Sequence, residues 1–185
     1  MRVFVAGASG FVGSSVVREL KGTGHAVVGL SRCEASVAAL ALAGAEVAHG
    51  DLARPETLSD PAAQADAVIH LAFDHDFSKF AENCANERRA IAAPGDALAG
   101  TQKLLIVTSS VGMVRTRGRP ATENDAPPSE GGFPRSPERA AGAGAQRGVR
   151  RDRAASAGAR HAPRGARHVR DRGRVGVKRV TRRVR

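Results

Sequence analysis

The chain has 185 residues, a formal net charge of +11, two cysteines, no tryptophan and no tyrosine. Its length suits one ordinary domain, and 42% apolar residues are enough to form a core. No segment approaches the roughly 20 apolar residues of a membrane-spanning helix, which excludes an integral membrane protein. We expect Cys33 and Cys84 to be reduced thiols of a cytoplasmic protein, because residues 1–5 enter a strand-like run and not a signal peptide.

Charge divides the chain into two segments. Residues 1–138 carry 13 basic and 16 acidic side chains, a net charge of −3, whereas residues 139–185 carry 16 basic and 2 acidic ones, a net charge of +14. The second segment is mainly Arg, Ala and Gly, with valine as its only large apolar residue. Such a composition buries too little surface to offset its ordering entropy. We therefore predict a globular domain over 1–138, followed by a disordered basic tail.

Two origins would explain the tail. A frameshift near Glu138 in a GC-rich gene would enrich Arg, Ala, Gly and Pro and leave an out-of-frame segment. A genuine basic arm would instead bind nucleic acid through its phosphates. Because residues 139–185 contain no aromatic side chain to stack on bases, such binding would be non-specific.

Strand-like and helix-like runs alternate through the first 110 residues. This alternation is typical of an α/β fold, a parallel sheet with helices on both faces, and right-handed crossovers favour a doubly wound order. The sheet is expected to stop after about five strands. The predicted strands are 2–6, 26–30, 46–48, 67–71 and 103–108, and the predicted helices are 11–21, 35–43, 55–62 and 78–98, the last broken or kinked at Pro94.

A glycine-rich string, Gly7-Ala8-Ser9-Gly10-Phe11-Val12-Gly13, joins the first predicted strand to the first predicted helix. In that position it predicts a dinucleotide-binding loop. Gly7 would allow the tight turn, Gly10 the approach of a pyrophosphate, and Gly13 the packing of helix on strand. The helix N-terminus would supply N–H groups and partial positive charge to the phosphates. A plain glycine turn is the alternative.

The second predicted strand ends in Leu30-Ser31-Arg32, with no acid at its tip. An NAD site usually places Asp or Glu there for the ribose hydroxyls, whereas Arg beside Ser suits the 2′-phosphate of NADP. NADP is therefore the expected cofactor, and the nearby Glu34 leaves NAD open. A solvated arginine at a loop edge is the alternative for Arg32.

Three more short motifs follow predicted strands, namely Gly50-Asp51-Leu52, His70-Leu71-Ala72 and Val107-Thr108-Ser109-Ser110. Together with the glycine loop they make residues 1 to about 138 resemble the short-chain dehydrogenase/reductase superfamily, specifically its NAD-dependent epimerase/dehydratase branch. The resemblance implies a Rossmann-type NAD(P)-binding domain.

It also implies roles for individual residues. Asp51 and Leu52 would line the adenine, and Leu71, Ala72 and Phe73 would pass the nicotinamide-side ribose. Asn86 is similar to the helix asparagine of that branch, and Ser110, with Ser109 or Thr108 as alternatives, would orient the substrate. Ordinary loop-capping and strand-end hydrogen bonds are the alternatives for Asp51 and the serines. The expected cofactor-binding residues are thus Gly7, Ser9, Gly10, Phe11, Val12, Gly13, Ser31, Arg32, Asp51, Leu52, Leu71, Ala72, Phe73 and Asn86.

Active members of the superfamily use a Tyr-x-x-x-Lys pair, in which tyrosinate is the general acid/base. Here Phe133 stands in the Tyr position and Pro137 in the Lys position, so carbonyl reduction through this pair is excluded. The expected function is the NAD(P)-binding domain of an epimerase/dehydratase-like oxidoreductase, inactive as written and lacking the substrate lobe. A non-enzymatic dinucleotide-binding or regulatory protein with a basic nucleic-acid-binding arm is the alternative.

Asp74-His75-Asp76 invites interpretation as a metal site. Three adjacent residues cannot readily converge on one ion, however, and no further ligand is suitably spaced. We expect a loop and the start of a helix there.

Overall fold

A five-stranded parallel sheet forms the centre of the protein, whose computed structural model describes residues 1–108, 116, 118–122 and 125. The strand order is β3-β2-β1-β4-β5. The chain therefore builds outward from β1 to one edge, returns past β1 and continues to the other edge, which is the predicted doubly wound order. The strands are β1 (Arg2–Ala6), β2 (Ala26–Ser31), β3 (Glu46–His49), β4 (Ala67–His70) and β5 (Leu104–Val107).

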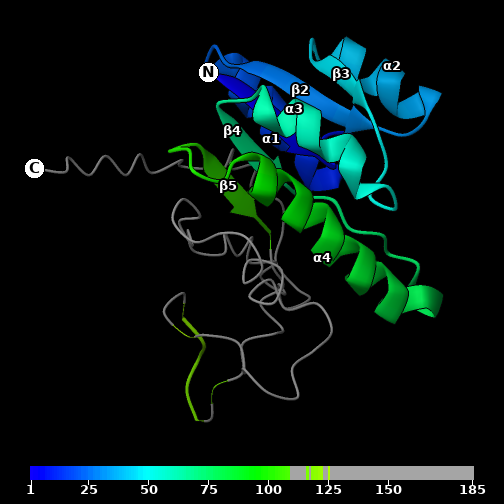
Figure 1. Ribbon diagram of the computed structural model, residues 1–185, viewed down its shortest axis with the longest axis vertical. Helices are drawn as coiled ribbons and strands as arrows, with labels where there is room; N and C mark the ends of the chain where they lie inside the picture. The colour runs from blue at the N-terminus through cyan, green and yellow to red at the C-terminus, as the bar shows by residue number, and fades with distance from the viewer. Residues whose placement is uncertain (109–115, 117, 123–124, 126–185) are drawn as a thin grey trace, which may run out of the picture.

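Helices cover both faces of this sheet (Figure 1). The helices α1 (Phe11–Gly22) and α2 (Glu34–Leu42) pack on one face. The opposite face carries the 3₁₀ turn η1 (Pro55–Leu58), α3 (Ser59–Ala63) and α4 (Phe80–Ala97), the last preceded by the 3₁₀ turn η2 (Phe77–Lys79).

The central strand β1 contributes to both layers of the core. Successive side chains of a strand point to opposite faces. Val3 and Val5 accordingly pack with Val17 of α1 and with α2, whereas Phe4 packs with the residues of α3 and α4. Val5, Phe4 and Val17 are fully buried. A strand buried on both sides explains why the sequence of β1 is almost wholly apolar.

The last long helix was expected to be broken or kinked at Pro94, and the predicted break is wrong. Helix α4 continues through Pro94 to Ala97. Proline removes one helical hydrogen bond, but Pro94 lies in the last turn, where its ring is fully buried. Burial of that ring offsets the lost bond. The predicted helix over 55–62 also differs, because a 3₁₀ turn precedes a short α-helix there.

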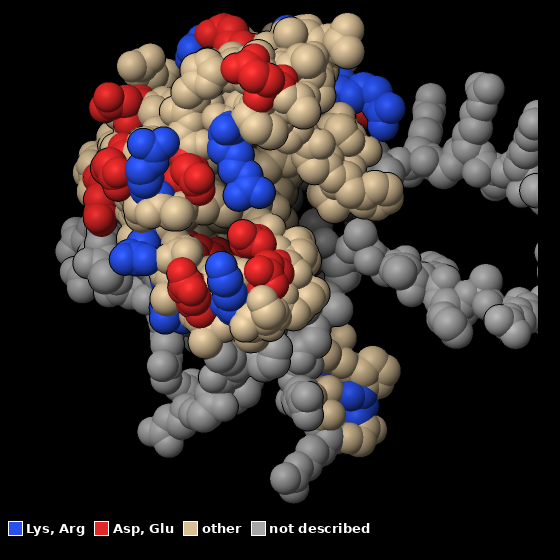
Figure 2. Space-filling model, turned by 90° about the vertical axis from the view of Figure 1, so that its right-hand side faces the viewer, with Lys and Arg blue, Asp and Glu red and all other residues tan. Residues whose placement is uncertain are grey.

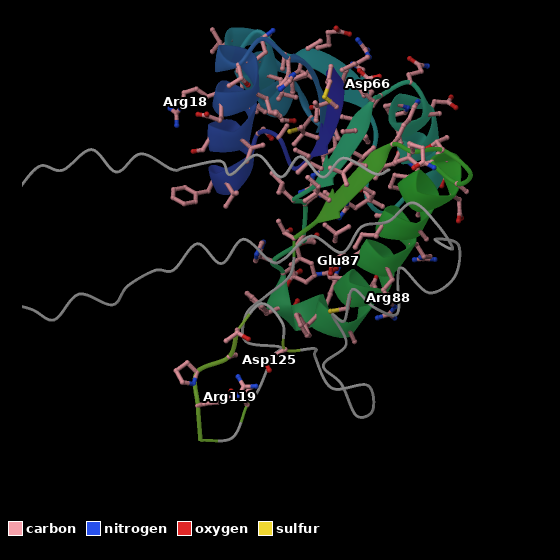
Figure 3. All side chains as sticks on the ribbon, turned by 90° about the vertical axis from the view of Figure 1, so that its left-hand side faces the viewer. Arg18, Asp66, Glu87, Arg88, Arg119 and Asp125 are labelled. Carbon is pink, nitrogen blue, oxygen red and sulfur yellow. The ribbon has the colours of Figure 1, made fainter. Side chains whose placement is uncertain are left out.

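Beyond β5, Arg119 and Asp125 form an ion pair (Figure 3). The Arg119 guanidinium donates to both carboxylate oxygens of Asp125, and the Thr122 backbone N–H and hydroxyl also donate to Oδ2 at 2.7 and 2.9 Å. Hydrogen bonding from Arg119 and Thr122 holds the pKa of Asp125 well below its usual range. The predicted boundary at residue 138, the tail and the Phe133/Pro137 positions lie outside the described residues.

Neither cysteine forms a disulfide: Cys33 is an exposed free thiol and Cys84 a buried one. Among the helices of residues 1–108, none has the length and apolar character needed to cross a membrane.

Candidate functional site

The glycine loop lies at the carboxyl end of β1, and two of its glycines are required by close packing. Gly7 has φ +83°, and a Cβ atom there would lie 2.8 Å from the backbone nitrogen of Ala72. A Cβ atom on Gly13 would lie 1.9 Å from the carbonyl oxygen of Gly7. Both distances are far inside van der Waals contact. The loop is therefore clamped between α1 and the segment that follows β4.

Gly10 has a different environment, because it faces open space. It is the N-cap of α1 with φ −75°, and its N–H donates to the Gly7 carbonyl at 3.1 Å. A Cβ atom on it would meet only that carbonyl oxygen, at 3.3 Å. The neighbouring Phe11 is 97% exposed and Val12 52% exposed. Among the described residues no side chain caps α1, so none of them partners its first N–H groups as a cap. The N-terminus of α1 and the open space at Gly10 together fit a pyrophosphate.

Ser31 and Arg32 at the end of β2 were both predicted to bind the cofactor, but the structure gives them different environments. Ser31 is 2% exposed, and its hydroxyl donates to the Cys33 carbonyl at 3.0 Å and contacts the Ser36 hydroxyl. Arg32 is exposed at the surface next to it. Ser31 thus supports the turn into α2, and Arg32 is the group that can reach a ligand. Hydrogen bonding from Ser36 lowers the pKa of the exposed Cys33 thiol.

Asp51 organises the turn after β3. Its backbone N–H donates to the Thr57 hydroxyl at 3.1 Å, and its Oδ1 accepts from the Ala53 N–H at 2.9 Å. This is the capping arrangement weighed as the alternative to an adenine contact, and it leaves Oδ2 without a hydrogen bond among the described residues. Leu52 is half-buried and packs against the core layer formed with α3 and α4.

The segment after β4 runs beside the glycine loop. Strand β4 ends at His70, and the Leu71 N–H donates to the Ala6 carbonyl at 2.9 Å, which ties this segment to the end of β1. Ala72 is the residue against which Gly7 packs. Phe73 follows directly, and its ring contacts His75 and Phe80 edge-on. The structure therefore brings residues 71–73 and the glycine loop together at one edge of the sheet.

Helix α4 supplies an asparagine that the sequence analysis missed. Asn86, the expected one, accepts a 2.5 Å hydrogen bond from Arg89 on its own helix. Asn83 is 7% exposed, and its amide donates to the carbonyls of Asp74 and Asp76 at 3.3 and 2.9 Å. The available signal was helical spacing, because Asn83 shares the buried face of α4 with Ala90 and Ile91.

Other candidate residues have local structural contacts or lie outside the described part. The Thr108 hydroxyl and N–H both donate to the His70 carbonyl, at 3.1 and 3.0 Å, and so extend the pairing of β5 with β4. Ser109 and Ser110 are outside the described residues. Asp76 caps η2 by accepting from the Ser78 N–H at 3.0 Å, as expected for a loop and helix start. Within the described ranges no group of three His, Cys, Asp or Glu side chains could hold a metal ion.

The sheet order, with a glycine loop between the central strand and an uncapped helix, defines a nucleotide-binding α/β protein of Rossmann type. The profile of the NAD-dependent epimerase/dehydratase family matches residues 3–127. The chain belongs to this family.

The chain is also similar to individual proteins. The chain is 46% identical over 123 residues to an uncharacterized protein of Schizosaccharomyces pombe. The matched region covers 66% of this chain and 42% of the relative. It is 39% identical over 127 residues to an uncharacterized protein of Saccharomyces cerevisiae, covering 68% and 42%. The crystal structure of gox2253 is similar, with 32% identity, a TM-score of 0.53 and coverage of 64% and 38%. The chain thus spans less than half the length of these relatives.

Proposed function

We propose that the chain binds NADP through the edge of the sheet formed by the glycine loop, the β2–α2 turn and the segment after β4. The observation that carries the proposal is the pair of glycine contacts, Gly7 against Ala72 and Gly13 against Gly7, beside the open N-terminus of α1. Only glycine fits the two packed positions, and the third, Gly10, leaves room for phosphate oxygens. When bound, the cofactor would supply hydride chemistry.

The position of Arg32 favours NADP over NAD as the cofactor. Its side chain is exposed at the carboxyl end of β2, where a 2′-phosphate would lie, and no acidic side chain replaces it at the strand tip. Glu34 is exposed at the first position of α2, close enough in the chain to keep NAD as the second candidate. Ser31 acts in this proposal only by holding the turn.

We propose no turnover through the family's tyrosine, because the 185 residues contain none. The nucleic-acid-binding arm of the alternative, residues 139–185, lies outside the described residues, and the described domain adds no basic surface to it. Residues 1–108 carry 9 basic and 12 acidic side chains, a net charge of −3. On the face in Figure 2 the two signs are interspersed, so no continuous positive surface follows a phosphate backbone there.

Calorimetric titration of NADP and of NAD into the full chain tests this function. Heat is the suitable signal because the chain has no Trp or Tyr to report binding by fluorescence. We expect one NADP per chain and weaker NAD binding, and Gly10→Val should abolish both by filling the phosphate approach. If the Gly10→Val variant bound NADP as tightly as the parent, the proposed cofactor site would be contradicted. Steady NADPH oxidation with any carbonyl or sugar-nucleotide compound would contradict the inactivity.

A further inference from the structure

Four aromatic side chains gather directly after β4, namely Phe73, His75, Phe77 and Phe80, called here the aromatic cluster. Ring centroids of Phe73 and His75 are 5.2 Å apart and those of Phe73 and Phe80 6.1 Å apart, both edge-on. Phe77 lies 6.1 Å from His75 and stacks on Phe80 at 5.9 Å with planes 22° apart. Each ring therefore contacts two others. Half of the chain's six phenylalanines occur within residues 73–80.

The aromatic cluster is open to solvent although its rings are apolar. Phe77 is 70% exposed and His75 is exposed, whereas Phe73 and Phe80 are half-buried beneath them. An isolated exposed phenylalanine is ordinary, but several contacting rings that remain exposed form a surface suited to a flat apolar partner.

The position of the cluster connects it to the proposed cofactor site. Phe73 follows Ala72, the residue against which the glycine loop packs through Gly7. Ligands of open parallel sheets bind outside the carboxyl ends of the strands, and the cluster begins at that end of β4. It therefore continues the same edge of the sheet, on the side that residues 71–73 form.

The polar groups around the cluster favour an uncharged ligand. Asp74 Oδ1 accepts from the Asp76 N–H at 2.9 Å, and Asp76 Oδ1 accepts from both Ser78 donors. The carbonyls of these two aspartates accept from Asn83. These contacts hold the backbone of the segment in place, with the rings of Phe77 and His75 exposed on it. With two carboxylates against one lysine, Lys79, the segment also repels a diphosphate-linked sugar.

We propose that the aromatic cluster is the docking surface for an uncharged, planar aromatic carbonyl compound beside the cofactor. The ring of such a ligand stacks on Phe77, where the exposed face of the ring is available. This inference rests on the proposed function, since a carbonyl is the group that the hydride chemistry of a bound NADPH would address, whereas the aromatic preference follows from the cluster alone. It concerns binding and not turnover.

A titration of 4-fluoroacetophenone followed by ¹⁹F NMR tests the proposal on the full chain, with and without saturating NADP. Phe77→Ala should weaken binding roughly three- to tenfold, the range expected for one lost aromatic contact. Phe77→Tyr retains the ring and should retain affinity. Leu42→Ala removes another exposed apolar side chain, 91% exposed on α2, and should change nothing. UDP-glucose should not displace the ketone.

Each result separates this inference from the proposed function. Unchanged ketone affinity in Phe77→Ala, displacement by UDP-glucose, or no ketone binding by a chain that binds NADP would overturn the aromatic site. Ketone binding that depends on Phe77, in a chain that fails to bind NADP, would support the aromatic cluster and overturn the cofactor assignment. Because Phe77 is largely exposed, its replacement leaves the core intact, and circular dichroism of each variant verifies this.

Discussion

The side-chain amide of Asn83 donates a 2.9 Å hydrogen bond to the backbone carbonyl of Asp76, seven residues earlier in the chain. A second bond, of 3.3 Å, joins the same amide to the Asp74 carbonyl. One buried side chain of α4 therefore fixes the path of the segment between β4 and η2. That segment begins with the residues that pack beside the glycine loop, so Asn83 of α4 helps to position one side of the candidate site.

Asn83→Asp should destabilise the protein because it keeps the shape of the side chain but removes the donor. Two carbonyls then lose their partner, and a carboxylate is placed in a buried position, which together should lower the free energy of unfolding by about 1–3 kcal/mol. Asn86→Asp is the matched control, since Asn86 only accepts from Arg89 on a half-exposed face. Urea unfolding followed by circular dichroism measures both. Equal losses in the two variants would show that Asn83 has no special role.

The fold could be predicted from the sequence because its signals are local and repeated. The strand over 2–6, the glycine punctuation and the helical spacing over 11–21 each specify one element, and parallel order follows from their alternation. Phe4 and Val5 are buried on opposite faces, as an apolar central strand requires.

The finer details could not be predicted, because they depend on tertiary contacts. Whether Pro94 ends a helix depends on the burial of its ring, and whether Asn83 or Asn86 faces the β4 segment depends on a rotation of α4 that spacing fixes only approximately. The sequence predicted that Ser31 and Arg32 would both bind the 2′-phosphate. Adjacent side chains at a strand end point to opposite sides, however, and that of Ser31 points inward.

Gly13→Ala and Gly10→Ala should have different effects on stability. Alanine in a helix is favoured over glycine by about 1 kcal/mol, which by itself would stabilise α1. At Gly13 the new methyl group would lie 1.9 Å from the Gly7 carbonyl oxygen, so the clash exceeds this gain, and we expect a net loss of about 2 kcal/mol or more. At Gly10 the nearest atom is 3.3 Å away and the loss should stay below about 1 kcal/mol. Thermal unfolding that ranks the two variants in reverse would contradict this packing.

Arg32→Ala should weaken NADP selectively. A charge-assisted contact to the 2′-phosphate contributes about 1.5–3 kcal/mol, a tenfold to hundredfold change in dissociation constant, whereas NAD has no phosphate there and should change little. Arg18→Ala serves as the control, because Arg18 stands on α1 away from the glycine loop and contacts Ser15 (Figure 3). Calorimetry with both cofactors measures the six affinities of the parent and the two variants. An equal loss for NAD and NADP would refute the phosphate contact.

The reactivity of Cys33 should depend on Ser36. The Ser36 hydroxyl lies 3.4 Å from Sγ, and its hydrogen bond, with that of its backbone, lowers the thiol pKa. The reactive thiolate of Cys33 is therefore present at lower pH than that of an ordinary cysteine. In Ser36→Ala this pKa rises, so alkylation by iodoacetamide should begin at higher pH and be slower at neutral pH, while Ser15→Ala should leave the profile unchanged.

Mass spectrometry distinguishes this site from Cys84, which is buried and should remain unmodified in the folded protein. Because Cys33 directly follows Arg32, saturating NADP should also slow its alkylation, and 2′-phosphate-free NAD should do so less at the same concentration. A pH profile identical in Ser36→Ala and the parent would remove the hydrogen bond as the cause of the lowered pKa. Protection by neither cofactor would place their binding away from the end of β2.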